Sequence, residues 1–289
     1  MPMGDMSQWR IETPTKMEFD GVIGLRVRLV GGSVAVLAAE GTSTLEVSQL
    51  EGDPLQVTFQ DGVLTIAHEN LSWEGLLKWL RPQRHAATVT VSVPRKTPAQ
   101  VGVVNAAAVV SGIGARTSVK SVSGEITLDG VTGEVDANTV SGALEAQGIN
   151  GTLSFSTVSG DLTLAEGWLE RLDANAVSGD VTADVDLDPL GGLNVNTVSG
   201  EVVLRLPAEA DAQVSLHSVS GDVRSEFAEL RRSSAPASRS VSGSLGAGSG
   251  HVSVTTMSGR VMLLRRPESH DTRAGQQPDN ENEMEGEAS

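Results

Sequence analysis

Cysteine and tyrosine are absent from this chain of 289 residues, and phenylalanine and tryptophan occur only four times each. The absence of cysteine excludes disulfide bonds, cysteine-ligated zinc and thiol nucleophiles. Because aromatic side chains are scarce, the core has to be built from valine, leucine, isoleucine and alanine. Such side chains suit thin, stacked β-strands better than a thick globular core.

Basic residues are also few, since 21 lysines and arginines stand against 37 aspartates and glutamates, for a net charge of −16. A charge of this sign repels the phosphate backbone of nucleic acids, and it disfavours anionic membranes for the same reason. We therefore expect no nucleic-acid partner for this chain.

Long apolar runs are missing as well. No stretch of the sequence reaches the roughly 20 apolar residues that a membrane-spanning helix needs, and the N-terminal residues contain no signal-peptide core. We expect a cytoplasmic protein with no transmembrane segment, and we leave open peripheral contact with a membrane and export by a non-standard route.

Residues 1–20 are expected to form an N-terminal arm, and residues 21–108 a region of alternating, antiparallel strands. Apolar and polar side chains alternate at residues 25–29, 34–36, 55–59 and 89–93. A period of two residues predicts half-buried strands. Gly31-Gly32 and Asp61-Gly62 lie between such runs, where they predict tight hairpin turns.

One segment of this region breaks the alternation. Trp73, Leu76, Leu77 and Leu80 fall at helical spacing and predict a short helix near residues 73–80. This helix lies in a basic, aromatic patch, which makes it a candidate for binding a partner or a membrane surface. The alternative is that it covers an exposed end of the sheet. The candidate partner-binding residues are Trp73, Lys78, Trp79, Arg81 and Arg84, together with Trp168 further along the chain.

The tripeptide Val-Ser-Gly, or a close variant, recurs through residues 109–266. Its glycine falls at positions 112, 124, 142, 160, 179, 200, 221, 243 and 259, and most intervals are 18–22 residues. Between 124 and 160 a half-period of nine residues appears as well. The spacing predicts a single-chain β-solenoid (β-helix) with nine-residue half-coils and 18–22-residue coils, whose strands pair with those of neighbouring coils. We expect a right-handed solenoid, stacked in sequence order.

Alignment of the copies on this glycine predicts which side chains form the core. The residues two before, two after and four after the glycine are mostly aliphatic, and we expect these columns to point inward. The valine of each copy then fills the core, the glycine turns the chain through its conformational freedom, and the serine faces water. Coils lengthen opposite Val-Ser-Gly, and we expect surface loops at residues 165–171, 186–192, 206–212 and 226–238.

The copies of Val-Ser-Gly followed by an acidic and then an aliphatic residue resemble the bacterial "putative adhesin" family of β-strand-repeat proteins of unknown function. Similar stretches occur at residues 105–112, 197–207 and 261–267, and the resemblance spans about residues 20–267. It implies architecture rather than chemistry, with no catalytic residues. The family name implies adhesion, and the association of some members with envelope-stress responses implies a role near the membrane.

An acidic residue follows the glycine in four successive copies, at Asp161, Asp180, Glu201 and Asp222. Adjacent coils would hold these carboxylates ~4.8 Å apart, where like charges repel by about 1 kcal/mol even in water. The column is therefore a weak candidate for a cation site. Solvated carboxylates beside backbone N–H groups are the alternative. No motif for a catalytic site, a metal or a cofactor is found in the sequence.

Residues 267–289 form a polar tail with seven acidic residues and one arginine, and we expect it to be disordered. Taken together, the patterns favour a non-catalytic β-solenoid scaffold or binding module, linked to cell-envelope stress or adhesion through an unknown protein or envelope component. A structural protein that assembles end to end is the first alternative, because solenoid ends expose strand edges. A carbohydrate-active β-helix enzyme is the second.

Overall fold

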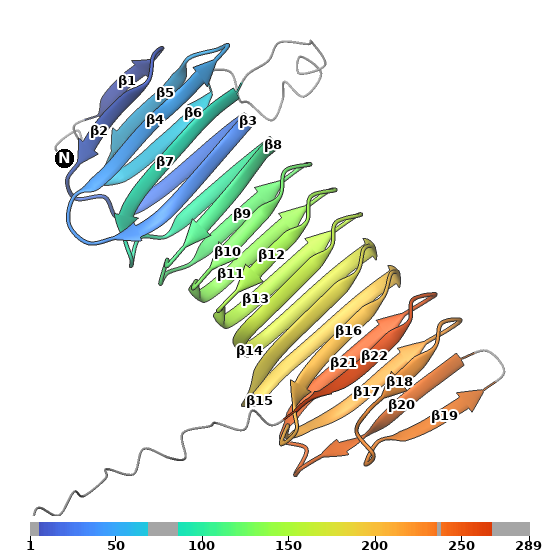
Figure 1. Cartoon of the computed structure of the whole chain (residues 1–289). Coiled ribbons are helices and arrows are strands. Elements are labelled where there is room, and N and C mark those ends of the chain that lie inside the picture. The colour runs from blue at the N-terminus through green and yellow to red at the C-terminus, as the bar shows by residue number, and fades with distance from the viewer. Residues whose placement is uncertain (1–5, 69–85, 236–237, 268–289) are drawn as a thin grey trace, which may run out of the picture.

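The computed structural model describes residues 6–68, 86–235 and 238–267, and every regular element in these ranges is a β-strand (Figure 1). The all-β prediction is confirmed. The helix predicted near residues 73–80 lies outside the described residues, as do Trp73, Lys78, Trp79, Arg81 and Arg84 and nearly all of the acidic tail. Within the described part of the chain, no helix has the length and apolarity that crossing a membrane would require.

Residues up to 111 form eight strands, which are β1 (Ser7–Ile11), β2 (Thr15–Phe19), β3 (Gly24–Ala39), β4 (Ser43–Glu51), β5 (Leu55–Gln60), β6 (Val63–His68), β7 (Ala86–Pro94) and β8 (Ala99–Ser111). The later strands are β9 (Thr117–Ser121), β10 (Ile126–Asp129), β11 (Thr132–Thr139), β12 (Leu144–Gln147), β13 (Asn150–Thr157), β14 (Leu162–Ser178), β15 (Val181–Ser199), β16 (Val202–Pro207), β17 (Ala212–Ser218), β18 (Val223–Ser225), β19 (Arg231–Ala235), β20 (Ser238–Leu245), β21 (Gly250–Thr256) and β22 (Val261–Arg266).

Apart from β19 and β20, the later strands stack in parallel on two opposite faces of the molecule. Face A contains β9, β11, β13, the second halves of β14 and β15, then β21 and β17. Face B contains β10, β12, the first halves of β14 and β15, then β16, β22 and β18. One circuit through both faces is called a coil. On face B, Ile126 pairs with Leu144 and Leu144 with Leu162, an offset of 18 residues for each coil.

The stack continues into the N-terminal region without a break. The long strand β3 pairs in parallel with β8, from Leu25 opposite Ala99 to Leu37 opposite Ser111, so β8 crosses the predicted boundary at residue 109. The predicted turn at Asp61-Gly62 is confirmed, since both residues have positive φ between the antiparallel strands β5 and β6. The predicted turn at Gly31-Gly32 is wrong, because both glycines lie inside β3.

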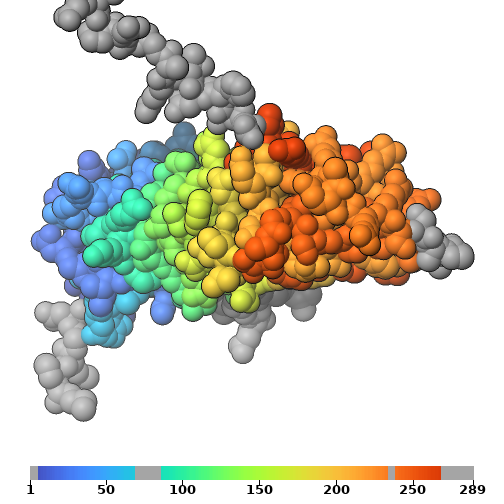
Figure 2. All heavy atoms as spheres, turned by 90° about the horizontal axis from the view of Figure 1, so that it is seen from below, coloured from blue at the N-terminus to red at the C-terminus, as the bar shows by residue number. Residues whose placement is uncertain are grey.

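The last coil is inserted between two earlier ones, contrary to the expected sequence order. Strand β21 pairs in parallel with β15 and β17, and β22 with β16 and β18. In Figure 1 the red strands of this coil accordingly lie between yellow-orange and orange ones, and in Figure 2 the red atoms lie away from both ends of the elongated molecule. The copy at Val241-Ser242-Gly243 forms no coil corner, because β20 runs antiparallel to β17 and β19.

The core between the two faces follows the predicted pattern after the glycines. The buried residues two positions after a repeat glycine include Ile126, Leu144, Leu162, Val181, Val202, Val223 and Val261. Two of the predicted loops, at residues 165–171 and 186–192, are instead largely strand. They belong to β14 and β15, which pair with each other through two shifts of register. The extra residues therefore lengthen the paired strands rather than form loops.

The corner glycines are required by close contact between coils. A Cβ atom on Gly142 would lie 2.1 Å from the carbonyl oxygen of Gly124, and one on Gly160 would lie 2.1 Å from that of Gly142. Gly124, Gly179, Gly221 and Gly259 are equally crowded. Since φ at Gly142 is outside the left-handed region, steric contact rather than conformational freedom explains this glycine.

We expect Gly142→Ala to lower the free energy of unfolding by about 3 kcal/mol, because two backbones would have to separate. Gly102→Ala, inside β8, is the control, since its Cβ would meet nothing closer than 3.9 Å. This control should leave stability unchanged or raise it by about 0.5 kcal/mol. Urea denaturation measures both variants, and equal losses of stability would contradict the account of the corners.

Candidate functional site: an exposed valine edge

The valine of Val-Ser-Gly points outward at the corners, contrary to the prediction. Its side chain is 43% exposed at Val122 and 51% exposed at Val177. The prediction is right for the half-period positions, where Val131 and Ile149 are fully buried, and for Val110 and Val241, which are buried as well. We call the exposed row the Val edge, which comprises, in the order of the stacked coils, Val122, Val140, Val158, Val177, Val198, Met257 and Val219.

At five of the seven corners of the Val edge, the residue before the exposed one explains this orientation. Thr139 and Thr157 are buried, and their hydroxyl oxygens accept the N–H groups of Gly142 and Gly160 at 2.8 and 2.7 Å. A buried N–H group without a partner is costly, and a valine in place of the threonine could not accept it. With the hydroxyl inside, the next side chain faces water. Ser121, Ser218 and Thr256 form the same bond.

The serine of the motif faces water, and its hydroxyl forms a hydrogen bond to the neighbouring coil. Ser141 donates its hydroxyl to the carbonyl oxygen of Val122 at 3.2 Å, and Ser159 donates to that of Val140 at 3.3 Å. The glycine, the serine and the preceding hydroxyl residue therefore each stabilise the corner. The valine side chain has no such internal role.

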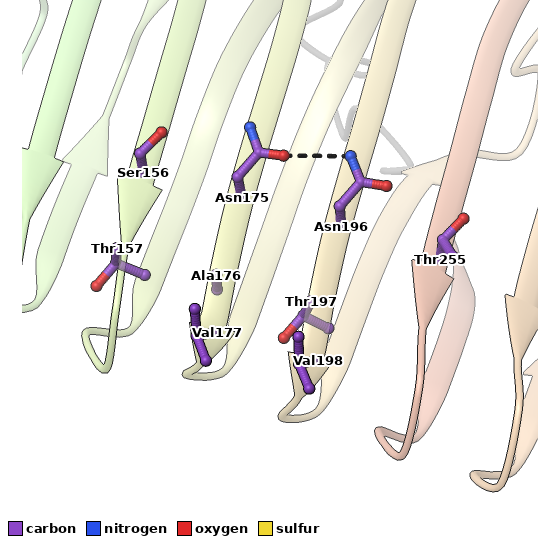
Figure 3. A pocket seen from close by; sticks show the side chains of 9 residues that line it. All are labelled: Ser156, Thr157, Asn175, Ala176, Val177, Asn196, Thr197, Val198 and Thr255. Carbon is purple, nitrogen blue, oxygen red and sulfur yellow. Dashed lines mark hydrogen bonds between the residues drawn. The ribbon is translucent and has the colours of Figure 1, made fainter.

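A shallow groove of about 320 Å³ runs along part of the Val edge on face A. Figure 3 shows Val177 and Val198 at its corner side and Asn175 and Asn196 further along the same strands. The Asn196 Nδ2 donates to the Asn175 Oδ1 at 3.3 Å, so the amides form a ladder parallel to the valines. The groove thus offers an apolar row and an uncharged hydrogen-bonding row side by side.

A second hollow of about 470 Å³ lies where the Val edge begins. Its lining combines valines with Arg26, Arg28, Gln100, Gly102 and Lys120. We call it the basic hollow. It was not foreseen from the sequence, because Arg26 and Lys120 are 94 positions apart and only the pairing of β3, β8 and β9 brings them together.

The acidic column is shorter than predicted. The Asp161 Oδ1 accepts the N–H group of Asp180 at 2.8 Å, and the Asp180 Oδ1 accepts that of Glu201 at 2.7 Å. The inserted coil places Arg260 between Glu201 and Asp222, so the prediction of four adjacent carboxylates is wrong at this point. Among the described residues, no group of three or more His, Asp or Glu side chains is placed to hold a metal ion.

Asp222 and Trp168, the two remaining candidates, lie at different strands, β18 and β14, and in different surroundings. The Asp222 carboxylate contacts Arg224 at 2.6 Å and Arg232 at 2.7 Å, and the hydrogen bond from Arg224 lowers its pKa below the ordinary value. Trp168 lies on β14 with 48% of its surface exposed, opposite Asn150 and Asp186 in the adjacent coils. The structure does not bring these residues together into one site.

Residues 36–264 match the family model described as Toastrack DUF4097. Among solved structures, a "putative lipid binding protein" of Parabacteroides distasonis is 13% identical, with a TM-score of 0.44, over 86% of this chain and 96% of that one. A "putative adhesin" of Bacteroides fragilis is 10% identical, with a TM-score of 0.35, over 91% and 98%. No functional argument follows from similarities of this size. The comparison with curated proteins gave no match.

We expect Asp222→Asn to lower the urea midpoint of unfolding at pH 7 and to lower it less at pH 3. The pKa of Asp222 is lowered in the folded state, so its charged form stabilises the fold above about pH 4 and loses this effect as the pH falls through the folded pKa. Glu209→Gln, an equal charge change at an exposed position, is the control. A difference of the same size at both pH values would contradict this role.

Proposed function

Because the chain belongs to the Toastrack DUF4097 family and repeats one exposed apolar position coil after coil, we propose that it is a non-catalytic β-solenoid binding module. Its contact surface would be the Val edge and the adjoining part of face A. The observation that carries the proposal is the exposure of the seven edge side chains, from 43% at Val122 to 58% at Met257. Contiguous apolar surface of this kind is typical of interaction sites.

The energy available along the Val edge supports this proposal. Covering a half-exposed valine contributes about 1 kcal/mol, half of what full burial of the side chain gives. At ~4.8 Å for each coil the row extends over roughly 30 Å. A regular row of this length suits an elongated partner that repeats its contacts from coil to coil.

The distribution of charge favours contact on the same side. Next to the Val edge, face A carries neutral polar side chains, which include Asn138, Ser156, Asn175, Asn196 and Thr255. Face B carries carboxylates in its outward columns, including Glu125, Glu145, Asp161, Asp180 and Asp184. A partner that lies along the Val edge and this neutral row therefore avoids the carboxylates of face B.

End-to-end assembly, the alternative function, is less well supported. The strands at the described ends of the stack carry charged side chains, with Arg10 on β1, Lys16 and Glu18 on β2, and Arg231 and Arg232 on β19. Charged residues on edge strands oppose pairing with another sheet. The side of the stack thus has a stronger case as a contact surface than its ends.

The proposal is tested with Val140→Thr, Val158→Thr, Val177→Thr and Val198→Thr combined in one variant. Threonine keeps the branched shape, so the unfolding midpoint should stay close to that of the parent chain, whereas ligands captured from extracts of the native cell should be lost at least tenfold. A control variant carries three exchanges of the same two residue types in the opposite direction on face B, which are Thr127→Val, Thr163→Val and Thr182→Val. Equal capture of the same ligands by the parent and the edge variant would refute the proposal.

A further inference from the structure

Three cationic side chains gather at the start of the Val edge. Arg26 and Arg28 lie on β3 and Lys120 on β9, and all three line the basic hollow. Among the residues that the structure describes, none forms a hydrogen bond or ion pair with these side chains. Most other arginines are paired, as Arg116 is with Asp136 at 3.0 Å. Unpaired cations in an acidic protein are available to an external anion.

The pairing of three strands sets the geometry of the hollow. Arg28 lies opposite Gly102 on β8, and Gly102 lies opposite Lys120 on β9. The two cations therefore stand two strands apart, ~10 Å between backbones, with no side chain between them. Arg26, Gln100 and Ser118 form the neighbouring row and add a third cation and two hydrogen-bonding groups.

Gly102 opens this space without being required by the fold. A Cβ atom there would meet only the Arg28 Cγ and the Val27 carbonyl oxygen, both at 3.9 Å, whereas a Cβ on Gly124 would lie 1.8 Å from a backbone oxygen. Glycine inside a strand lowers stability compared with a residue that has a side chain. Gly102 therefore lowers the stability of the strand, and it leaves space between Arg28 and Lys120.

We propose that the basic hollow binds the phosphate headgroup of a single anionic amphiphile, whose apolar part lies along the first valines of the Val edge. Guanidinium groups bind phosphate oxygens through paired, charge-assisted hydrogen bonds, and a lysine adds a point charge. Val104, Val122 and Val140 line the same hollow, so apolar surface begins where the cations end. This inference rests on the proposed binding role of the Val edge and names the ligand class at one end of it.

The surrounding charges permit such a ligand. Among the residues that the structure describes, no carboxylate lines the hollow, and Asp136, opposite Ser118, is paired with Arg116. The carboxylates of face B are on the other side of the stack, where salt screens charges beyond about 8 Å. A single amphiphile, rather than an anionic bilayer, is the ligand that fits, because an extended anionic surface would meet the net charge of −16.

The test is calorimetric titration of the full chain with dihexanoyl phosphatidic acid below its critical micelle concentration. We expect it to bind at least tenfold more tightly than dihexanoyl phosphatidylcholine or inorganic phosphate. Gly102→Leu, which fills the hollow, and Lys120→Gln should each weaken binding at least tenfold. Arg231→Gln, the same change of charge on β19 at the far end of the stack, should change binding less than twofold.

Each other outcome counts against the inference. Unchanged affinity in folded Gly102→Leu and Lys120→Gln proteins, judged by their unfolding midpoints, would overturn it, as would no binding by the parent chain. Equal affinity for inorganic phosphate would overturn the amphiphile and leave a simple anion site. Val177→Thr with Val198→Thr, remote from the hollow, should leave phosphatidic acid binding intact, so a failure here is distinguishable from a failure of the wider Val-edge proposal.

Discussion

The contact between glycine backbones at the corners is the constraint on which the rest of the stack depends. Gly142 lies against the carbonyl group of Gly124, and Gly160 against that of Gly142, with no room for a Cβ atom. The buried N–H groups of Gly142 and Gly160 then need acceptors, which the inward hydroxyls of Thr139 and Thr157 supply from the same coil. The coil with Ala176 meets the same need differently, since the N–H of Gly179 donates to the carbonyl oxygen of Ser199 at 3.2 Å.

The binding surface follows from this constraint. With the hydroxyl residue inside, the valine is left in water, and the repetition of the coil turns one exposed side chain into a row. The row beside the Val edge on face A is largely neutral, whereas the outward columns of face B carry carboxylates such as Asp161 and Asp180. At its N-terminal end the row meets Arg28 and Lys120 across Gly102, so apolar and cationic contacts become available together.

Much of the fold could be predicted from the sequence, because local alternation and the 18-residue spacing both report on pairing. The inside–outside alternation of a strand is interrupted at each corner. Counted forward from buried Ala137, it places Thr139 inside and Val140 outside. Counted backward from buried Leu144, it places Val140 inside. Only the forward count is right. The inserted coil, which places Arg260 beside Asp222, could not be predicted, since nothing local to a strand specifies its partner. The basic hollow could not be predicted either, because it depends on the pairing of strands that are distant in the sequence.

The orientation of the corner residues can be measured directly, because the chain contains no cysteine. Single cysteines are introduced as Val140→Cys, Val158→Cys and Val177→Cys, and as Thr139→Cys and Thr157→Cys, and their reaction with a maleimide is followed in the folded protein. The account predicts that thiols at the three valine positions react at the rate of an exposed thiol, and that thiols at the two threonine positions react only as the protein unfolds. Protected thiols at the valine positions together with reactive ones at the threonine positions would contradict it.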